Sequence, residues 1–170
     1  MTQTKDKYSL VIVPRGEVRE QLQTLIEDLA LHNNAPAFTP HITVVSNIFA
    51  APDELAHERD KAIELANKVG KFTVTLHKYG FLNEEFRCLF LLAHSEAFES
   101  VYANAATIYP QVNNQHFRQL PHLSVLYGTY PQETKDRIIA DHPMPPLEFD
   151  VESFDLYKTN GPASSWQLDE

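Results

Sequence analysis

Two pentapeptides in the sequence combine a histidine with a hydroxyl residue two positions later. They are residues 40–44 (PHITV) and residues 121–125 (PHLSV), and they lie about half the chain apart. Side chains on a β-strand alternate between its two faces, so the histidine and the hydroxyl residue of each pentapeptide share one face. Residues two apart on a strand are about 6.5–7 Å apart, which lets both contact one small anion. We therefore expect each pentapeptide to present an imidazole and a hydroxyl to the same ligand.

Two histidines in one cleft could supply both proton transfers of phosphodiester hydrolysis. A neutral imidazole near pH 7 can remove a proton from water, while a protonated one donates to the leaving oxygen. His41 and His122 are the candidates for these roles. Thr43 and Ser124 would donate hydrogen bonds to the non-bridging phosphate oxygens, and neither needs to act as a nucleophile. The pattern indicates in-line attack by water on a small phosphodiester.

Other kinds of catalytic site have less support in the sequence. The other six histidines are scattered, and no H-x-H or H-E-x-x-H pair indicates a metal site. The G-x-S-x-G turn of serine hydrolases is also absent. A single histidine beside a proline is more often structural than catalytic, so the functional hypothesis depends on the repetition of the motif in both halves. We expect no metal and no cofactor.

Composition limits the kind of partner. Of the 170 residues, 43% are hydrophobic and 11% aromatic, enough for a packed interior. The net charge of −9 argues against a surface for long RNA or DNA, because such surfaces depend on lysine and arginine. A local pocket can still hold a small anion. The expected partner is therefore a small phosphorylated molecule and not a long nucleic acid.

The sequence also gives expectations about location and assembly. The single cysteine, Cys88, lies in an apolar run that we expect to be buried, and it can form no intramolecular disulfide. The apolar stretch near the N-terminus is too short for a signal peptide, and no apolar run reaches membrane-spanning length. We expect a soluble, cytoplasmic protein with no membrane contact, and nothing in the sequence demands more than a monomer.

Periodicity predicts an α+β fold with mainly antiparallel sheets. Apolar residues at helical spacing predict helices over residues 17–31, 53–69, 95–106 and 132–140. Apolar and β-branched runs predict strands over residues 8–13, 41–48, 72–82, 86–93, 121–127, 147–158 and 166–168. The apolar phase changes within residues 147–158, which predicts a β-bulge near Ser153. Residues 111–119 are expected to form a loop. Strands and helices in this order are typical of an α+β protein.

The two motifs, one in each half of an α+β chain, resemble those of the two-histidine (2H) phosphoesterase superfamily. Within it, residues 121–128 (PHLSVLYG) are most similar to the cyclic phosphodiesterases of plants and yeast. The opening Tyr8-Ser9-Leu10 and the closing Trp166-Gln167-Leu168 agree with that branch. The resemblance implies one bilobal domain over residues 1–170, with two antiparallel sheets around a central cleft, helices outside and a pseudo-two-fold repeat.

The resemblance also implies an activity and a set of site residues. Members of the family open 2′,3′-cyclic nucleotides to 2′-phosphates, and some open ADP-ribose 1″,2″-cyclic phosphate to the 1″-phosphate. By motif, His41, Thr43, His122 and Ser124 would form the catalytic tetrad, with the two hydroxyls also binding the substrate. The analogy favours His122 as the base and His41 as the acid, but the symmetry of the halves leaves this open. Tyr127 could pack against a base or ribose, or could be a core tyrosine.

Four further residues and two further functions have alternative interpretations. Val11 stands where a larger aromatic residue is expected in plant members, which puts base stacking at that wall in question. Arg87 and Lys78 could add positive charge to the cleft or be ion-paired or solvated, and His116 has no assigned place. Processing of RNA ends that carry 2′,3′-cyclic phosphates is an alternative function. A third hypothesis is a non-catalytic module that binds an AMP-like nucleotide.

Overall fold

Eight antiparallel strands form one sheet at the centre of the molecule. The computed structural model describes residues 2–169. The strands follow the order β6-β3-β4-β5-β2-β1-β7-β8 across the sheet. Their bounds are β1 Asp6–Ile12, β2 Ile42–Ala50, β3 Phe72–Phe81, β4 Leu89–His94, β5 His122–Leu126, β6 Leu147–Val151, β7 Asp155–Lys158 and β8 Gln167–Asp169. The α+β class expected from the sequence is confirmed.

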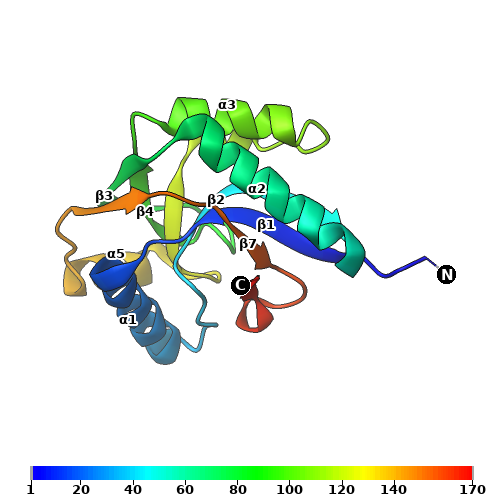
Figure 1. Cartoon of the computed structure of the whole chain (residues 1–170). Helices are drawn as coiled ribbons and strands as arrows, with labels where there is room; N and C mark the ends of the chain where they lie inside the picture. Colours follow the sequence, from blue (N-terminus) through cyan, green and yellow to red (C-terminus); the bar gives the residue numbers. More distant parts are fainter. Residues whose placement is uncertain (1, 170) are drawn as a thin grey trace.

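The longer helices gather in two pairs outside the sheet. Figure 1 shows α2 (Leu55–Val69) and α3 (Phe98–Ile108) together at the top, and α1 (Gly16–Asn33) and α5 (Gln132–Asp141) together at the lower left, with the strands between them. The remaining helical segments are short: α4 (Gln115–Gln119) and the single turns η1 (Pro52–Glu54) and η2 (Ala163–Ser165). In the part of the chain that the structure describes, no helix combines the length and apolar character needed to cross a membrane.

The sheet consists of two four-stranded halves that join at one point. The strands β6, β3, β4 and β5 form one half, and β2, β1, β7 and β8 form the other. They meet where β2 pairs with β5, through Ile42 opposite Leu123. These two residues directly follow His41 and His122 in the chain. The lobes expected from the resemblance are therefore halves of one continuous sheet, and the joint between them brings the two histidine motifs together.

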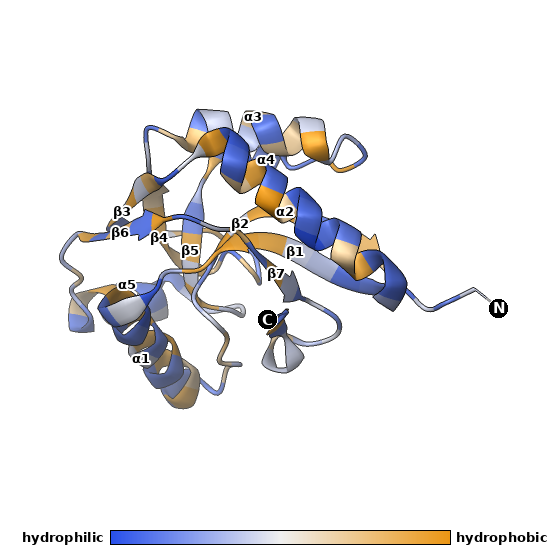
Figure 2. Ribbon diagram, in the orientation of Figure 1, coloured by the Kyte–Doolittle hydropathy of each residue, from blue (hydrophilic) through white to orange (hydrophobic). Residues whose placement is uncertain are grey.

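Apolar spacing explains why the helices pack on this sheet. In α1, Leu22, Leu25, Ile26 and Leu29 are buried at intervals of three or four residues, which places them on one face. Figure 2 shows blue and orange residues alternating along the helices, whereas the C-terminal half of β1 is continuously orange. Burying each large apolar side chain contributes about 1.5–3 kcal/mol to folding. The four helices predicted from periodicity are confirmed as α1, α2, α3 and α5, with ends shifted by a few residues.

Two sequence-based expectations were wrong in detail. Residues 147–158 form no single bulged strand: β6 lies at the edge beside β3, whereas β7 lies between β1 and β8 in the other half. The apolar phase changes near Ser153 because the chain leaves β6 there and crosses between the halves at residues 152–154, so β7 starts a new pairing with β1 and β8. Residues 111–119, expected to be a loop, contain the short helix α4.

The hairpin between β3 and β4 is longer than its sequence suggested. We expected a turn at residues 83–85 with a strand starting at Phe86, but β4 starts at Leu89. Residues 82–88 thus form an irregular connection, here called the β3–β4 loop, and Phe86 within it is 48% exposed. Cys88 at the end of the loop is buried, as expected.

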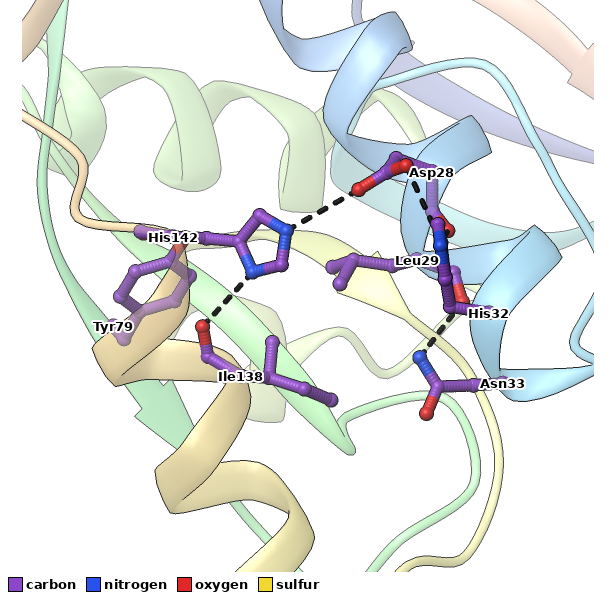
Figure 3. Close-up of polar contacts among 7 residues, drawn as sticks. All are labelled: Asp28, Leu29, His32, Asn33, Tyr79, Ile138 and His142. Carbon is purple, nitrogen blue, oxygen red and sulfur yellow. Dashed lines mark hydrogen bonds and ion pairs between the residues drawn. The ribbon is translucent and has the colours of Figure 1, made fainter.

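A polar cluster ties the C-terminal ends of α1 and α5 together (Figure 3). The Nδ1–H of His142 donates to the Ile138 carbonyl at 3.0 Å, and its Nε2 lies 3.2 Å from Oδ2 of Asp28. The other carboxylate oxygen of Asp28 faces Nδ1 of His32 at 3.3 Å. The Tyr79 hydroxyl donates to the His142 carbonyl at 2.7 Å, which connects β3 to the same cluster.

Candidate active site

One cavity of about 470 Å³ lies where the two halves of the sheet join. All five site residues proposed from the sequence line it: His41, Thr43, His122, Ser124 and Tyr127. The other lining residues come from both halves and from the loops above them: Lys7, Ser9, Ser46, Asn47, Glu84, Glu85, Phe86, Arg87, His116, Phe117, Thr159, Gly161 and Trp166. The cavity volume falls within the range typical of small-molecule sites.

The same backbone hydrogen bond orients both histidines. The Nδ1 of His41 lies 2.7 Å from the Thr39 carbonyl oxygen, and the Nδ1 of His122 lies 2.7 Å from the Leu120 carbonyl oxygen. A carbonyl only accepts, so Nδ1 carries the proton in each ring. The Nε2 atom is then the nitrogen available to a ligand, as an acceptor when the ring is neutral and a donor when it is protonated.

Aromatic side chains surround the two imidazoles. The His41 ring meets Tyr157 edge-on at a centroid distance of 4.8 Å. The His122 ring lies 5.0 Å from Phe90 and 6.4 Å from Phe117. Only 8% of each histidine is exposed. This packing restrains the ring planes and leaves little of either imidazole accessible to water.

Burial shifts the titration of His41 strongly. Loss of solvation disfavours the charged imidazolium and lowers the pKa of His41 to about 4. The hydrogen bond to the Thr39 carbonyl opposes this shift, and the nearby His122 adds to it. His41 is therefore neutral at pH 7 in the free protein.

Charged neighbours, in addition to burial, affect the pKa of His122. Burial again lowers the pKa of His122, and the hydrogen bond to the Leu120 carbonyl opposes the shift. The positive charges of Arg87 and His116 lower it further, whereas the carboxylate of Glu84 raises it. No carboxylate has this effect on His41. The two imidazoles thus have matching geometry but different electrostatic surroundings.

The two hydroxyl residues of the motifs differ in their present partners. Ser124 Oγ donates a hydrogen bond to the Phe86 carbonyl at 2.9 Å. A hydroxyl has a single hydrogen, so Ser124 must turn away from Phe86 before it can donate to a phosphate oxygen. Thr43 lines the cavity half-buried, and its carbonyl accepts a hydrogen bond from the Tyr102 hydroxyl at 3.1 Å.

Tyr127 lies mainly within the core, with part of its surface on the cavity. It is 5% exposed and stacks on Phe38 at a centroid distance of 3.9 Å. Its ring also meets Phe86 edge-on at 5.2 Å and Trp166 at 5.8 Å. Burial raises the pKa of its hydroxyl. Tyr127 therefore supports the aromatic wall of the cavity from behind.

The sequence pattern did not predict this aromatic wall. Phe86 and Trp166 lie 5.7 Å apart with their rings inclined by 31°, and both line the cavity. Val11, where we considered an aromatic wall, is fully buried and does not line the cavity. The sequence pattern places Trp166 in the predicted strand over residues 166–168 and Phe86 at the start of the predicted strand over residues 86–93. The high exposure of Phe86 could not be predicted because the hairpin turn was placed too early.

Charged residues border the cavity beside His122. Arg87 donates two hydrogen bonds to Glu84, at 2.7 and 2.8 Å, so it is ion-paired and also lines the cavity. His116 on α4 lies against Phe117 and joins the same lining. Lys78 is exposed and lies outside the cavity. Among residues 2–169, no group of three or more histidine, cysteine or acidic side chains is arranged to hold a metal ion.

Solved structures share this fold. The Thermus thermophilus protein TT0787 has a TM-score of 0.63 and 18% identity, with 96% of this chain and 95% of that chain covered. Escherichia coli LigT in complex with phosphate has a TM-score of 0.60 at 15% identity, covering 98% and 95%. LigT in complex with 3′-AMP has a TM-score of 0.59 at 17% identity, over the same shares. The arrangement of strands and helices in this chain is therefore shared with these solved structures and with one named a phosphoesterase.

Sequence comparison identifies the family. The model of the 2′-5′ RNA ligase superfamily matches residues 14–163, and the chain belongs to this superfamily, which comprises the 2H phosphoesterases. A cyclic phosphodiesterase from Arabidopsis thaliana is 28% identical over 138 residues, which are 77% of this chain and 70% of the relative. The resemblance inferred from the two histidine motifs is confirmed, and with it the expectation of an enzyme of the phosphodiesterase class.

Proposed function

We propose that the protein hydrolyses a small cyclic phosphodiester by acid–base catalysis between His41 and His122, without a metal ion. The observation that carries the proposal is the matched pair of imidazoles, each with Nδ1 bound to a backbone carbonyl and Nε2 available in one cavity. The proposed substrate is a 2′,3′-cyclic nucleotide opened to the nucleoside 2′-phosphate, or ADP-ribose 1″,2″-cyclic phosphate opened to the 1″-phosphate. The Arabidopsis relative, a cyclic phosphodiesterase by name, supports this substrate class.

The reaction requires two proton transfers on opposite sides of the phosphorus. One neutral imidazole takes a proton from water as the water oxygen bonds to phosphorus. The bond from phosphorus to the opposite ribose oxygen breaks, and the second imidazole, protonated, gives its proton to that oxygen. Thr43 and Ser124 donate hydrogen bonds to the non-bridging oxygens, where negative charge increases in the transition state. At the end the two rings have exchanged protonation states.

The strong lowering of the pKa of His41 by burial favours His41 as the base and leaves His122 as the acid, the reverse of the roles that the family analogy favoured. The productive form has one neutral and one protonated ring, and it is most populated when the base has the lower pKa. Burial and the charge of His122 hold the pKa of His41 at about 4. Glu84 favours the protonated form of His122 alone. An anionic phosphodiester between the rings would raise both pKa values.

The aromatic wall provides a place for the nucleoside. Phe86 and Trp166 offer apolar ring surface to the cavity, with Tyr127 packed behind them. Stacking of a base on an aromatic side chain contributes about 1–3 kcal/mol. Since every base has such a face, this wall would bind a base without strong preference among the four.

The direct test is hydrolysis of 2′,3′-cyclic AMP in excess chelator, with the position of the phosphate in the product identified by phosphorus NMR. We expect the 2′-phosphate. His41→Ala and His122→Ala should each reduce kcat by about 10²–10⁴-fold, because each removes one proton transfer. His32→Ala is the matched control, since that histidine is exposed and lies outside the cavity. Turnover close to the wild-type rate in either cavity variant would show that the two-histidine mechanism is wrong.

The two roles separate with a substrate whose leaving group needs no proton. A 4-nitrophenyl phosphodiester of a nucleoside releases nitrophenolate unaided, so loss of the acid should matter little while loss of the base still matters. We expect His122→Ala to recover most of the wild-type rate on this substrate and His41→Ala to remain impaired. The opposite pattern would restore the assignment with His122 as the base.

Two other functions are distinguished in the same assays. An RNA oligonucleotide ending in a 2′,3′-cyclic phosphate tests the processing of RNA ends. Its hydrolysis with a kcat/KM well above that of the mononucleotide would favour RNA, against which the net charge of −9 argues. Binding of AMP without turnover of any cyclic phosphate would favour a nucleotide-binding module.

A further inference from the structure

The β3–β4 loop supplies a large share of the cavity wall without being part of the sheet. Glu84, Glu85, Phe86 and Arg87 are consecutive, and all four line the cavity. Within the loop, the Leu82 amide donates to the Arg87 carbonyl at 3.0 Å, which closes it into a compact unit. The position of the unit therefore decides where the aromatic and charged parts of the wall lie.

Three hydrogen-bonding contacts hold the backbone and Asn83 of this loop, and they come from β5, α5 and the segment between them. The Gly128 amide donates to the Glu85 carbonyl at 2.9 Å, and Ser124 Oγ donates to the Phe86 carbonyl at 2.9 Å. The third contact is the ammonium of Lys135 on α5, which lies 3.0 Å from the Leu82 carbonyl oxygen and 3.5 Å from Oδ1 of Asn83.

Lys135 has an unusual environment for a lysine. It is 1% exposed, and its acceptors among the described residues are a carbonyl and an amide oxygen, with no carboxylate. Its ammonium also lies 5.8 Å from the centroid of the Phe81 ring. A buried cation without a paired anion is costly to folding, and an apolar side chain of similar volume often stabilises such a site. The lysine is thus best explained by the loop that its ammonium holds.

Under the proposed function, the hydrogen bond from Ser124 to the Phe86 carbonyl breaks when the substrate binds. When Ser124 donates its single hydrogen to a phosphate oxygen, it can no longer donate to the Phe86 carbonyl. The loop would then lose one of its three contacts at the moment when Phe86 and Arg87 must surround the nucleotide. The contact made by Lys135 does not involve the cavity, so it persists when ligand is bound.

We propose that Lys135 is a positioning residue that holds the β3–β4 loop in place while Ser124 is engaged by the phosphate. The inference rests on the proposed role of Ser124. Lys135 does not touch the cavity, so it acts only through the loop, which carries Phe86 of the aromatic wall and the charged Glu84 and Arg87 beside His122.

The test compares Lys135→Met with the wild-type protein. We expect KM for 2′,3′-cyclic AMP and Kd for AMP to rise about tenfold while kcat at its pH optimum changes less than about twofold, since displacement of Phe86 weakens binding and displacement of Glu84 and Arg87 shifts only the pH profile through His122. The melting temperature should not fall, and amides of residues 82–88 should exchange hydrogen faster. Lys68→Met controls for the loss of a lysine on an exposed helix face, and Ile138→Val controls for weaker packing of α5.

Three outcomes would overturn the proposal. The first is a folded Lys135→Met protein with unchanged KM and unchanged loop exchange. The second is faster loop exchange with unchanged AMP affinity, because the loop position would then be irrelevant to binding. The third needs no variant and applies even if Lys135→Met does not fold: saturating inorganic phosphate should leave the loop of the wild-type protein protected, so marked loosening of residues 82–88 would show that Ser124 is the main tether. AMP binding and exchange are measured without turnover, so they decide this proposal even if no cyclic phosphate is hydrolysed.

Discussion

At the scale of residues, the two cavity histidines make the same backbone hydrogen bond but have different neighbouring side chains. Both Nδ1 atoms are bound to carbonyls two residues earlier. Glu84 and Arg87 act on His122, whereas His41 is surrounded by the rings of Phe38 and Tyr157. The two histidines therefore have matching geometry, but side chains outside the two motifs give them different electrostatic surroundings.

The pH dependence of kcat/KM follows from these neighbours. The base must be neutral, so activity falls as the pH drops through the pKa of His41, about 4. The acid must be protonated, so activity falls as the pH rises through the pKa of His122, which burial lowers below its usual 6.5. We expect a bell with its maximum between these limits, and a kcat profile displaced to higher pH by the bound anion.

Glu84→Gln provides the check on this profile. Removing the carboxylate takes away the charge that raises the pKa of His122, so the basic limb should move to lower pH while the acid limb stays in place. Movement of the acid limb alone would mean that Glu84 acts on the base, and the two roles would have to be exchanged.

At the scale of elements, the joint between β2 and β5 positions the site. Ile42 and Leu123 face each other there and are fully buried. Each directly follows a catalytic candidate, so the pairing that joins the two halves of the sheet also sets the spacing of the histidines. Under the proposed mechanism, stability and catalysis are coupled at this one contact.

Truncation at the joint should reveal the coupling. Ile42→Ala and Leu123→Ala should each reduce the free energy of unfolding by about 2–5 kcal/mol, as for other fully buried aliphatic residues. Each should also lower kcat at temperatures where the variant remains folded, because the neighbouring histidine shifts. Leu65→Ala is a matched control, since Leu65 is equally buried but lies on α2 outside the cavity. An equal loss of kcat in the control would attribute the effect to general loosening.

At the same scale, several features could be predicted from the sequence. The histidine strands, the four longer helices and the burial of Cys88 followed from local spacing, because each depends on residues close together in the chain. The crossing at residues 152–154 did not follow, since a phase change looks the same for a bulge and for a chain that changes its partner strands. The β3–β4 loop was placed wrongly because Phe86 has the composition of a strand residue.

At the scale of the whole molecule, the cavity is assembled from segments at both ends of the chain. Lys7 near the N-terminus and Trp166 near the C-terminus line the same space as Arg87 from the middle. The repeated motif predicted that His41 and His122 would share a cleft, because both halves carry the same pattern. The motif did not predict the positions of Trp166, His116 or Lys135. These residues lie outside both copies of the motif, and long-range packing alone determines where they lie.

Trp166 is the single tryptophan of the chain, and it lies in the cavity wall against Phe86. Selective excitation of indole fluorescence therefore reports from this one location. A nucleotide base that stacks on the indole should quench its emission, whereas inorganic phosphate bound between the histidines should leave it nearly unchanged. The natural sequence thus contains an intrinsic optical probe that separates occupancy of the base site from occupancy of the phosphate site.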